Sequence, residues 1–131
     1  MMKTTKINKF KMFFFALALL NISCHDEDAL YEYQVVNSTN FEIKVDVLAT
    51  LNAFTDTTYT IGAQQSKIIY YTSHGVEGSG APYFQDVAVD LQTIKIRKND
   101  TIVSNRDYRQ NNNWQYSGAF YKATVTEEEF Q

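Results

Sequence analysis

The clearest hydrophobic pattern in the chain lies in residues 41–51, FEIKVDVLATL, where every second side chain is apolar. The alternating apolar positions are Phe41, Ile43, Val45, Val47, Ala49 and Leu51. A period of two places one face of a strand against a core and the opposite face in water. A helix would scatter the same apolar residues around its circumference. The pattern therefore predicts a half-buried strand.

Shorter apolar segments follow along the rest of the chain, with turn-forming residues between them. We predict further strands at residues 31–36, 57–61, 66–72, 86–91, 94–96, 101–104, 114–116 and 120–126, and one helical turn at 127–130. Hairpin turns are predicted at 37–40 (NSTN), 62–65, 98–100 and 117–119. Short strands at regular spacing with turn signals are typical of an all-β sandwich or barrel. We expect an all-β, antiparallel, immunoglobulin-like β-sandwich of about 7–9 strands, and the alternative is a small open β-barrel.

The first 23 residues carry a different pattern. Four lysines lie between residues 3 and 11 with no acid among them, and an uninterrupted apolar run, MFFFALALL, follows at 12–20. A positive segment, a short apolar run and a small residue before a cleavage point are typical of a secretory signal. The run is too short to cross about 30 Å of hydrocarbon, which takes roughly 20 apolar residues. We predict that residues 1–23 are a signal peptide that is removed.

Cys24, the single cysteine, follows this segment directly. One cysteine forms no disulfide within its own chain, and a free thiol is a liability in an oxidising compartment. The context resembles the lipid acceptor of bacterial lipoproteins, with Ile22 and the small Ser23 before the cleavage point. Asn21 departs from the leucine usual at that place, and Leu20 lies one residue further back. The resemblance implies acyl chains such as palmitate at Cys24, where two chains anchor a protein stably, and ordinary secretion is the alternative.

An acidic cluster comes next. Asp26, Glu27 and Asp28 resemble the surface-export signal of Bacteroidetes lipoproteins, and a block of like charges also behaves as a solvated tether. We therefore divide the chain into a signal peptide (1–23), a lipidated acidic tether (24–30) and one β-sandwich domain (31–131). The expected location is the outer membrane, lipid-anchored and surface-exposed, with the periplasmic face of that membrane as the alternative.

Removing residues 1–23 changes the formal net charge from −3 to −7 and leaves nine Tyr, five Phe and one Trp. Nucleic-acid binding needs clustered Lys and Arg to neutralise phosphates, so an acidic domain is a poor candidate for it. An acidic domain is not attracted to anionic lipid either. Attachment to the membrane is therefore expected through the N-terminal lipid alone.

Residues that carry catalytic or metal chemistry are sparse. Apart from the thiol, the candidates are His25 and His74, and no Cys, His and carboxylate set has the spacing of a zinc or calcium site. We interpret His74 as a plain surface residue, and Asp86, Asp90 and residues 127–129 as solvated carboxylates. No catalytic residue, metal or cofactor is predicted, and a hydrolase built from two facing carboxylates is the least favoured class.

Two segments are longer than ordinary turns. Residues 73–85 hold three of the five glycines and the only proline, and residues 105–113 (NRDYRQNNN) are rich in Arg and Asn. Loops on a rigid scaffold build recognition sites, and these residue types make adaptable contacts. The candidate ligand-binding residues are Tyr83, Tyr108, Arg109, Trp114 and Tyr116. Alternatively, the loops are plain connections and the strand aromatics pack in the core or across strands.

Two further stretches, Asp56-Thr57-Thr58 and Asp100-Thr101-Ile102, resemble the Bacteroidetes O-glycosylation motif, which makes Thr57 and Thr101 candidate acceptors. The chain as a whole resembles small Bacteroidetes lipoproteins of unknown function, in YEYQVVNS at 31–38, in the alternating strand 41–51 and in the tail 124–130. The resemblance implies a fold and a location and carries over no catalytic residue. We expect a lipid-anchored, non-enzymatic binding or assembly module with a protein or glycan partner, and the alternative is a carbohydrate-binding module that uses exposed aromatics.

Overall fold

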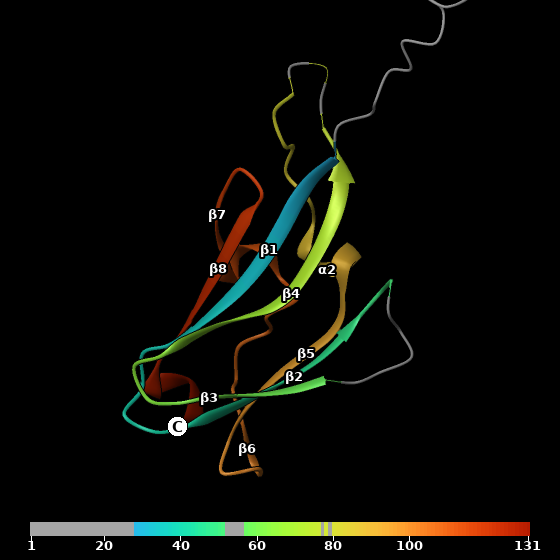
Figure 1. The fold of residues 1–131 in the computed structure, drawn as a ribbon. Helices are drawn as coiled ribbons and strands as arrows, with labels where there is room; N and C mark the ends of the chain where they lie inside the picture. Colours follow the sequence, from blue (N-terminus) through green and yellow to red (C-terminus); the bar gives the residue numbers. More distant parts are fainter. Residues whose placement is uncertain (1–27, 52–56, 77, 79) are drawn as a thin grey trace, which may run out of the picture.

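The computed structural model describes residues 28–51, 57–76, 78 and 80–131 and contains two four-stranded sheets (Figure 1). The strands are β1 (Asp28–Asn37), β2 (Ile43–Ala49), β3 (Thr57–Ile61), β4 (Ser66–Gly75), β5 (Leu91–Lys98), β6 (Ile102–Val103), β7 (Gln115–Ser117) and β8 (Phe120–Val125). Single helical turns lie at α2 (Val87–Asp90), η1 (Asn111–Asn113) and η2 (Glu127–Phe130). The sheet orders are β4-β1-β8-β7 and β3-β2-β5-β6. The all-β sandwich predicted from the sequence is confirmed. The alternative, an open barrel, is not observed, because the strands of the described residues form two separate sheets.

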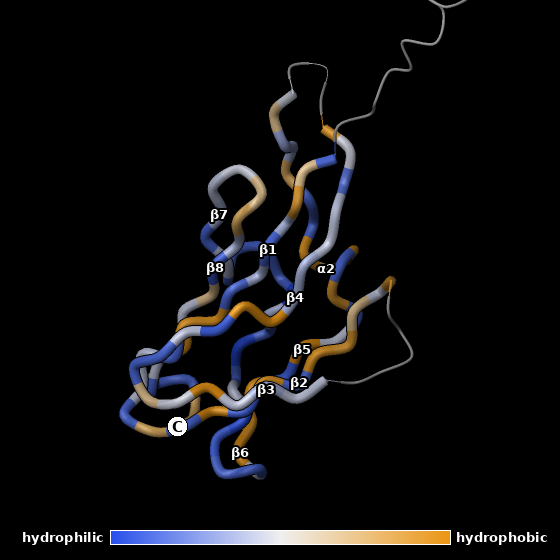
Figure 2. The backbone as a smooth tube through the Cα atoms, viewed as in Figure 1, coloured by the Kyte–Doolittle hydropathy of each residue, from blue (hydrophilic) through white to orange (hydrophobic). Residues whose placement is uncertain are grey.

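The period-two pattern determines which side chains form the core. In β2, Ile43, Val45, Val47 and Ala49 are buried and alternate with half-buried positions, as predicted. In β1, Tyr31, Tyr33 and Val35 are fully buried. Buried residues from both sheets belong to one core cluster. Figure 2 shows hydrophobic residues along the central strands and hydrophilic ones at the turn beside β6.

Two of the predicted hairpins are wrong. The connection 38–42 leads from β1 in one sheet to β2 in the other, and the connection 62–65 leads from β3 back to β4. β1 instead pairs antiparallel with β4 and parallel with β8. The buried Asn37 accounts for the change, because its amide nitrogen donates to the carbonyl oxygens of Phe41 (2.7 Å), Ile61 (3.1 Å) and Gly62 (2.9 Å). One side chain thus holds both connections as arches between the sheets.

The remaining predicted turns are confirmed. β5 and β6 form a hairpin around Asn99 and Asp100, which both have positive φ, and β7 and β8 form one in which Gly118 has φ +60°. Asn, Asp and Gly are the residues that tolerate this left-handed backbone in tight turns. The helical turn predicted at 127–130 is η2, and Thr126 and Glu129 cap it reciprocally.

The predicted strand at 86–91 is wrong, because residues 87–90 form the helical turn α2. The Asp86 carboxylate accepts a hydrogen bond from the Ala88 backbone N–H (3.0 Å) and caps this turn. Leu91 then begins β5. An alternating apolar pattern over so few residues does not separate one helical turn from a strand.

The first strand begins earlier than predicted. β1 starts at Asp28, which pairs with Gly75 of β4, so residues 28–30 of the expected tether belong to the sheet. The expected signal peptide and Cys24, Asp26 and Glu27 lie outside the described residues. Because β1 and β8 are parallel, the start of β1, the end of β4 and the β7–β8 turn lie at the same end of the sandwich (Figure 1). We call this end the Asp28 end.

Candidate binding surface

The outer face of the β4-β1-β8-β7 sheet carries a row of side chains with one member from each strand. Tyr71 of β4 is opposite Glu32 of β1, Glu32 is opposite Phe120 of β8, and Phe120 is opposite Ser117 of β7. Tyr71 and Phe120 are both exposed. Since neighbouring strands lie about 4.8 Å apart, the two aromatic positions are separated by about 10 Å, with a carboxylate between them.

The next row along the same face is polar. Gln34 of β1 is opposite Lys122 of β8, and Lys122 is opposite Gln115 of β7. Among the described residues, the side chains of Glu32, Lys122 and Gln115 make no hydrogen bond or ion pair, whereas Gln34 donates to Ser66 (3.2 Å). These groups are available to a ligand that offers hydrogen-bond donors and acceptors.

Two shallow depressions lie along β7 and β8 and share Gln115 and Lys122. One has a volume of about 280 Å³ and is lined by Gln115, Tyr116, Ser117, Phe120 and Lys122. The other has about 170 Å³ and is lined by Arg106, Asn112, Asn113, Trp114, Gln115, Lys122 and Thr124. Together they lead from an aromatic part of the surface to a part rich in amides and cations.

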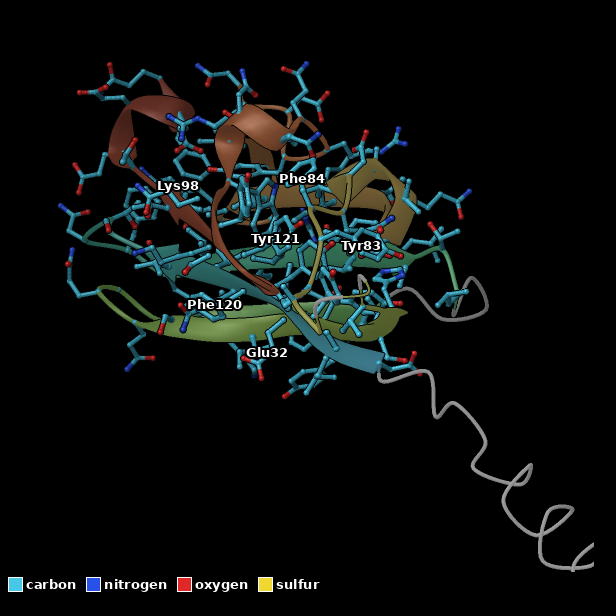
Figure 3. All side chains as sticks on the ribbon, turned by 90° about the horizontal axis from the view of Figure 1, so that it is seen from above. Glu32, Tyr83, Phe84, Lys98, Phe120 and Tyr121 are labelled. Carbon is cyan, nitrogen blue, oxygen red and sulfur yellow. The ribbon has the colours of Figure 1, made fainter. Side chains whose placement is uncertain are left out.

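A second aromatic group covers the Asp28 end, where the segment before α2 meets the β7–β8 hairpin. The rings of Phe84 and Tyr116 are 4.8 Å apart between centroids, and Tyr116 is stacked on the buried Tyr121 at 5.8 Å. Figure 3 looks onto the molecule from above and shows Tyr83, Phe84 and Tyr121 gathered at this end. Phe84 and Tyr116 are 44% and 56% exposed, so aromatic surface faces solvent here.

Two buried tyrosines hold this aromatic segment in place. The Tyr31 hydroxyl donates to the Tyr83 carbonyl oxygen (2.6 Å), and the Tyr121 hydroxyl donates to the Gln85 carbonyl oxygen and accepts from the Gln85 N–H (both 2.8 Å). Burial raises the pKa of Tyr121, which keeps its hydroxyl protonated as a donor. Hydrogen bonds on either side of Phe84 therefore fix the backbone of residues 83–85, and this holds the Phe84 ring at the surface.

The structure separates the five predicted ligand-binding residues. Tyr83, Tyr116 and Arg109 are exposed, and the Arg109 Nε donates to the Leu91 carbonyl (3.3 Å). Tyr108 and Trp114 are 1% and 6% exposed, and the Trp114 indole donates to the Tyr108 carbonyl (2.7 Å). Their burial corrects the prediction, because neither ring is free to stack on a ligand.

A buried polar cluster that the sequence did not predict links the β4-β1-β8-β7 sheet to the helical turn α2. Asp90, interpreted above as solvated, is buried and accepts hydrogen bonds from the Tyr33 hydroxyl (2.5 Å) and the His74 Nε2 (2.8 Å). Burial and then the bond to Asp90 raise the pKa of Tyr33 above its usual range. His74, interpreted as a surface residue, is mostly covered and pairs with this carboxylate. No spacing signal connects these residues, since they come from β1, β4 and α2.

A similar cluster surrounds Glu129, another carboxylate that was interpreted as solvated. Glu129 is buried and accepts hydrogen bonds from Ser104 (2.8 Å), Tyr108 and the Thr126 N–H (2.9 Å). Burial, and then the bond to Glu129, raises the pKa of Tyr108 above its usual range. Every buried side-chain polar atom in the described part of the chain has a hydrogen-bond partner. Both carboxylates therefore serve as acceptors for buried hydroxyls.

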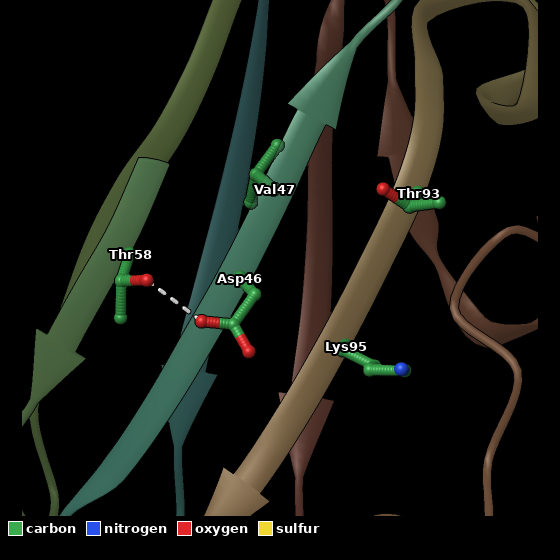
Figure 4. A pocket seen from close by; sticks show the side chains of 5 residues that line it. All are labelled: Asp46, Val47, Thr58, Thr93 and Lys95. Carbon is green, nitrogen blue, oxygen red and sulfur yellow. Dashed lines mark hydrogen bonds between the residues drawn. The ribbon is translucent and has the colours of Figure 1, made fainter. Parts of the chain in front are cut away.

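The largest of the three depressions described, about 340 Å³, lies on the outer face of the other sheet and is lined by Asp46, Val47, Thr58, Thr93 and Lys95 (Figure 4). Thr58 donates to Asp46 (2.7 Å), and Arg97 binds the same carboxylate through its Nε (2.6 Å) and Nη2 (2.8 Å). Arg97 holds the pKa of Asp46 below its usual range. The carboxylate is thus engaged within the sheet.

The candidate glycosylation acceptors are both exposed. Thr57 is the first residue of β3, and Thr101 follows Asn99 and Asp100, which both have positive φ, in the β5–β6 turn.

No helix in the described part of the chain is long and apolar enough to cross a membrane. Within residues 28–51, 57–76, 78 and 80–131, no three His, Cys, Asp or Glu side chains are placed to share a metal ion. The chain matches no protein-family model, no curated protein and no solved structure.

Proposed function

We propose that this chain is a lipid-anchored, non-enzymatic binding module of the outer membrane, and that it binds its partner through the outer face of the β4-β1-β8-β7 sheet. The observation that carries the proposal is the row of Tyr71, Glu32 and Phe120 beside Lys122 and Gln115, whose side chains have no partner among the described residues. Exposed aromatics next to unengaged polar groups are what a binding surface offers, since rings supply contact area and polar groups supply selectivity.

The proposed location rests on the N-terminal chemistry. The apolar run at 12–20 and Cys24 resemble a lipoprotein signal, and the acidic residues after Cys24 resemble a surface-export signal. The distribution of hydrogen bonds in the folded part supports a role without catalysis, because the buried carboxylates of Asp90 and Glu129 are engaged by hydroxyls of the core.

Anchorage is tested by metabolic labelling with a palmitate analogue, followed by fractionation. The wild type should carry the label and pellet with membranes, and Cys24→Ala should lose both properties. Label that survives in Cys24→Ala, or a variant that still pellets, contradicts the anchor.

Partner binding is tested by cross-linking on intact cells. The wild type should enrich a partner that Phe120→Ser loses. Ile102→Ser, on β6 of the other sheet, is the matched control and should retain the partner. A partner retained equally by both variants, or none enriched from intact cells, contradicts the assigned surface.

One observation favours a carbohydrate as the partner. Tyr71 and Phe120 lie about 10 Å apart by strand spacing, comparable with two linked pyranose rings, and the carboxylate of Glu32 and the amide of Gln34 lie between or beside them. Rings stack on sugar faces while carboxylates and amides bind hydroxyls. A glycan array should give hits that Phe120→Ala weakens and Phe84→Ala does not, and an empty array excludes this candidate.

A further inference from the structure

The Asp28 end of the sandwich is the part of the fold closest to Cys24 along the chain. Three residues lie between Cys24 and Asp28, the first residue of β1, so the two are four steps apart along the chain. An extended chain spans at most about 3.6 Å per residue, so Asp28 lies within about 14 Å of Cys24. If Cys24 carries lipid, as proposed above, this end of the domain is held next to the bilayer.

The Asp28 end also exposes apolar side chains from separate elements. The exposed side chains are Tyr83 and Phe84 of the segment before α2, Tyr116 of β7, whose ring contacts Phe84, and Leu30 of β1, which lies on the opposite face of its sheet from Tyr116. Tyr31 and Tyr121 hold the backbone of 83–85, so these rings do not fold back into the core. Soluble surfaces rarely gather large apolar side chains in one place without an interaction partner.

The charges at the Asp28 end indicate which kind of lipid surface it can contact. None of residues 28–33, 80–91 and 115–121 is Lys or Arg, whereas Asp28, Glu32 and Asp86 are acidic. Anionic lipid attracts basic residues, so it would not attract this surface. The contact does not need that attraction, because amphipathic Tyr rings favour the boundary between headgroups and acyl chains, and Phe84 and Leu30 add apolar area to the contact.

We propose that the Asp28 end, through Leu30, Tyr83, Phe84 and Tyr116, lies against the headgroup region of a zwitterionic bilayer and orients the anchored domain. The contact orients the domain and the lipid on Cys24 anchors it. In this orientation the outer face of the β4-β1-β8-β7 sheet, with Tyr71 and Phe120, lies at the side of the domain. It is close to the bilayer but remains exposed to solvent. The inference rests on the proposed lipidation of Cys24.

The test uses the full, lipidated protein reconstituted in phosphatidylcholine vesicles whose acyl chains are brominated near the headgroup, because bromine quenches tryptophan on contact. Phe84→Trp places a reporter in the contact. Ile102→Trp is the control, since Ile102 is 42% exposed, close to the 44% of Phe84, and lies on β6 of the other sheet. The native Trp114 is buried and contributes the same background to both variants.

The emission added by Phe84→Trp should be quenched several-fold more than that added by Ile102→Trp, and the difference should persist at high salt, because the contact is apolar. Equal quenching of the two reporters overturns the proposal. If Phe84→Trp does not fold, Tyr116→Trp places the reporter on a side chain that is already exposed, with the same expected result.

The two proposals fail in different ways. Protein that lacks the palmitate label and does not join the vesicles refutes the anchor and, with it, the orientation. Protein that joins the vesicles but shows equal quenching refutes the orientation alone. Phe84→Trp that is also quenched in the Cys24→Ala chain supports a contact surface that reaches the bilayer without the lipid.

Discussion

Replacing Asn37, the last residue of β1, with alanine should strongly destabilise the domain. Asn37 is fully buried at the end of β1. Its amide nitrogen donates to the carbonyl oxygens of Phe41 and Gly62, one in each connection, and to that of Ile61 at the end of β3. Its Oδ1 accepts from the Thr39 N–H (3.0 Å) and the Thr39 hydroxyl (2.7 Å). The side chain therefore holds both arches on which the sandwich topology depends.

The size of the stability loss depends on which partners of Asn37 still have another hydrogen bond when its side chain is removed. The Phe41 carbonyl also accepts from the Thr39 hydroxyl (2.8 Å), and the Gly62 carbonyl also accepts from the Gln65 N–H (3.2 Å). The Thr39 N–H loses its partner, which costs about 1–3 kcal/mol, and each other lost bond costs about 0.5–1.5 kcal/mol. Added over the Thr39 N–H and the four other bonds, these costs come to about 3–9 kcal/mol. Because the Phe41 and Gly62 carbonyls keep a second donor, we expect the loss for Asn37→Ala at the lower end, about 3–5 kcal/mol, out of about 5–15 kcal/mol for a typical domain.

Chemical and thermal unfolding of the purified protein measure this loss, which corresponds to a drop of about 15–30 °C in Tm for a domain of this size. Asn40→Ala is the matched control, because Asn40 is exposed in the connection that follows Asn37, and it should change stability by less than about 0.5 kcal/mol. Asn37→Asp should be at least as destabilised as Asn37→Ala near neutral pH, since it presents a carboxylate to carbonyl oxygens. If Asn37→Ala unfolds within about 1 kcal/mol of Asn40→Ala, the hydrogen-bond account of the arches is wrong.

Three further predictions concern pH and the anchor. Because Arg97 lowers the pKa of Asp46, the stability that this pair contributes is present above about pH 4 and is lost as the pH falls through the folded-state pKa. Arg97→Gln should therefore reduce the loss of stability in acid, measured by urea unfolding at a series of pH values. The same pH dependence in the variant and the wild type would contradict this. Burial raises the pKa of Tyr33 and Tyr108, so their contribution is present below about pH 10 and is lost as the pH rises further; tyrosinate absorbance and loss of circular dichroism should therefore appear together, and ionisation of all tyrosines in a folded domain would argue against it. Cys24→Ala should leave the Tm of the domain released from the membrane unchanged, because Cys24 precedes the first strand, and a lowered Tm would show that the thiol contributes to the fold.

The local elements were predictable because their signals are short-range. Alternation in β2 placed Ile43 and Val45 on the buried face, and the structure agrees. Hairpin turns were predicted at 98–100 and 117–119, and the structure places Asn99 and Gly118 there with positive φ. Each of these signals depends only on neighbouring residues, whose conformational preferences do not require knowledge of the partner strand.

The candidate surface was only partly predictable. Of the candidate ligand-binding residues, Tyr83 and Tyr116 are exposed, whereas Tyr108 and Trp114 are buried. An aromatic side chain suits a core as well as a binding surface, so its identity does not reveal its exposure. Phe120 was not among the candidates, because the sequence predicts a strand at 120–126 but does not show which face of the sheet each side chain occupies. Its register with Glu32 places Phe120 on the outer face.

The sequence by itself determined most of the strand-forming segments, the turns at 98–100 and 117–119, the acidic charge after residue 23 and the chemistry of the N-terminal segment that motivates the anchor. The tertiary structure alone decided that β1 pairs with β4 and β8, and that Asp90 and Glu129 are buried. A connection such as 38–42 has the same residues whether it closes a hairpin or crosses between sheets, and a carboxylate has the same charge in water or in a core. The difference lies in contacts between distant residues, such as Asn37 with Gly62 and Tyr33 with Asp90, which form only when the two sheets come together.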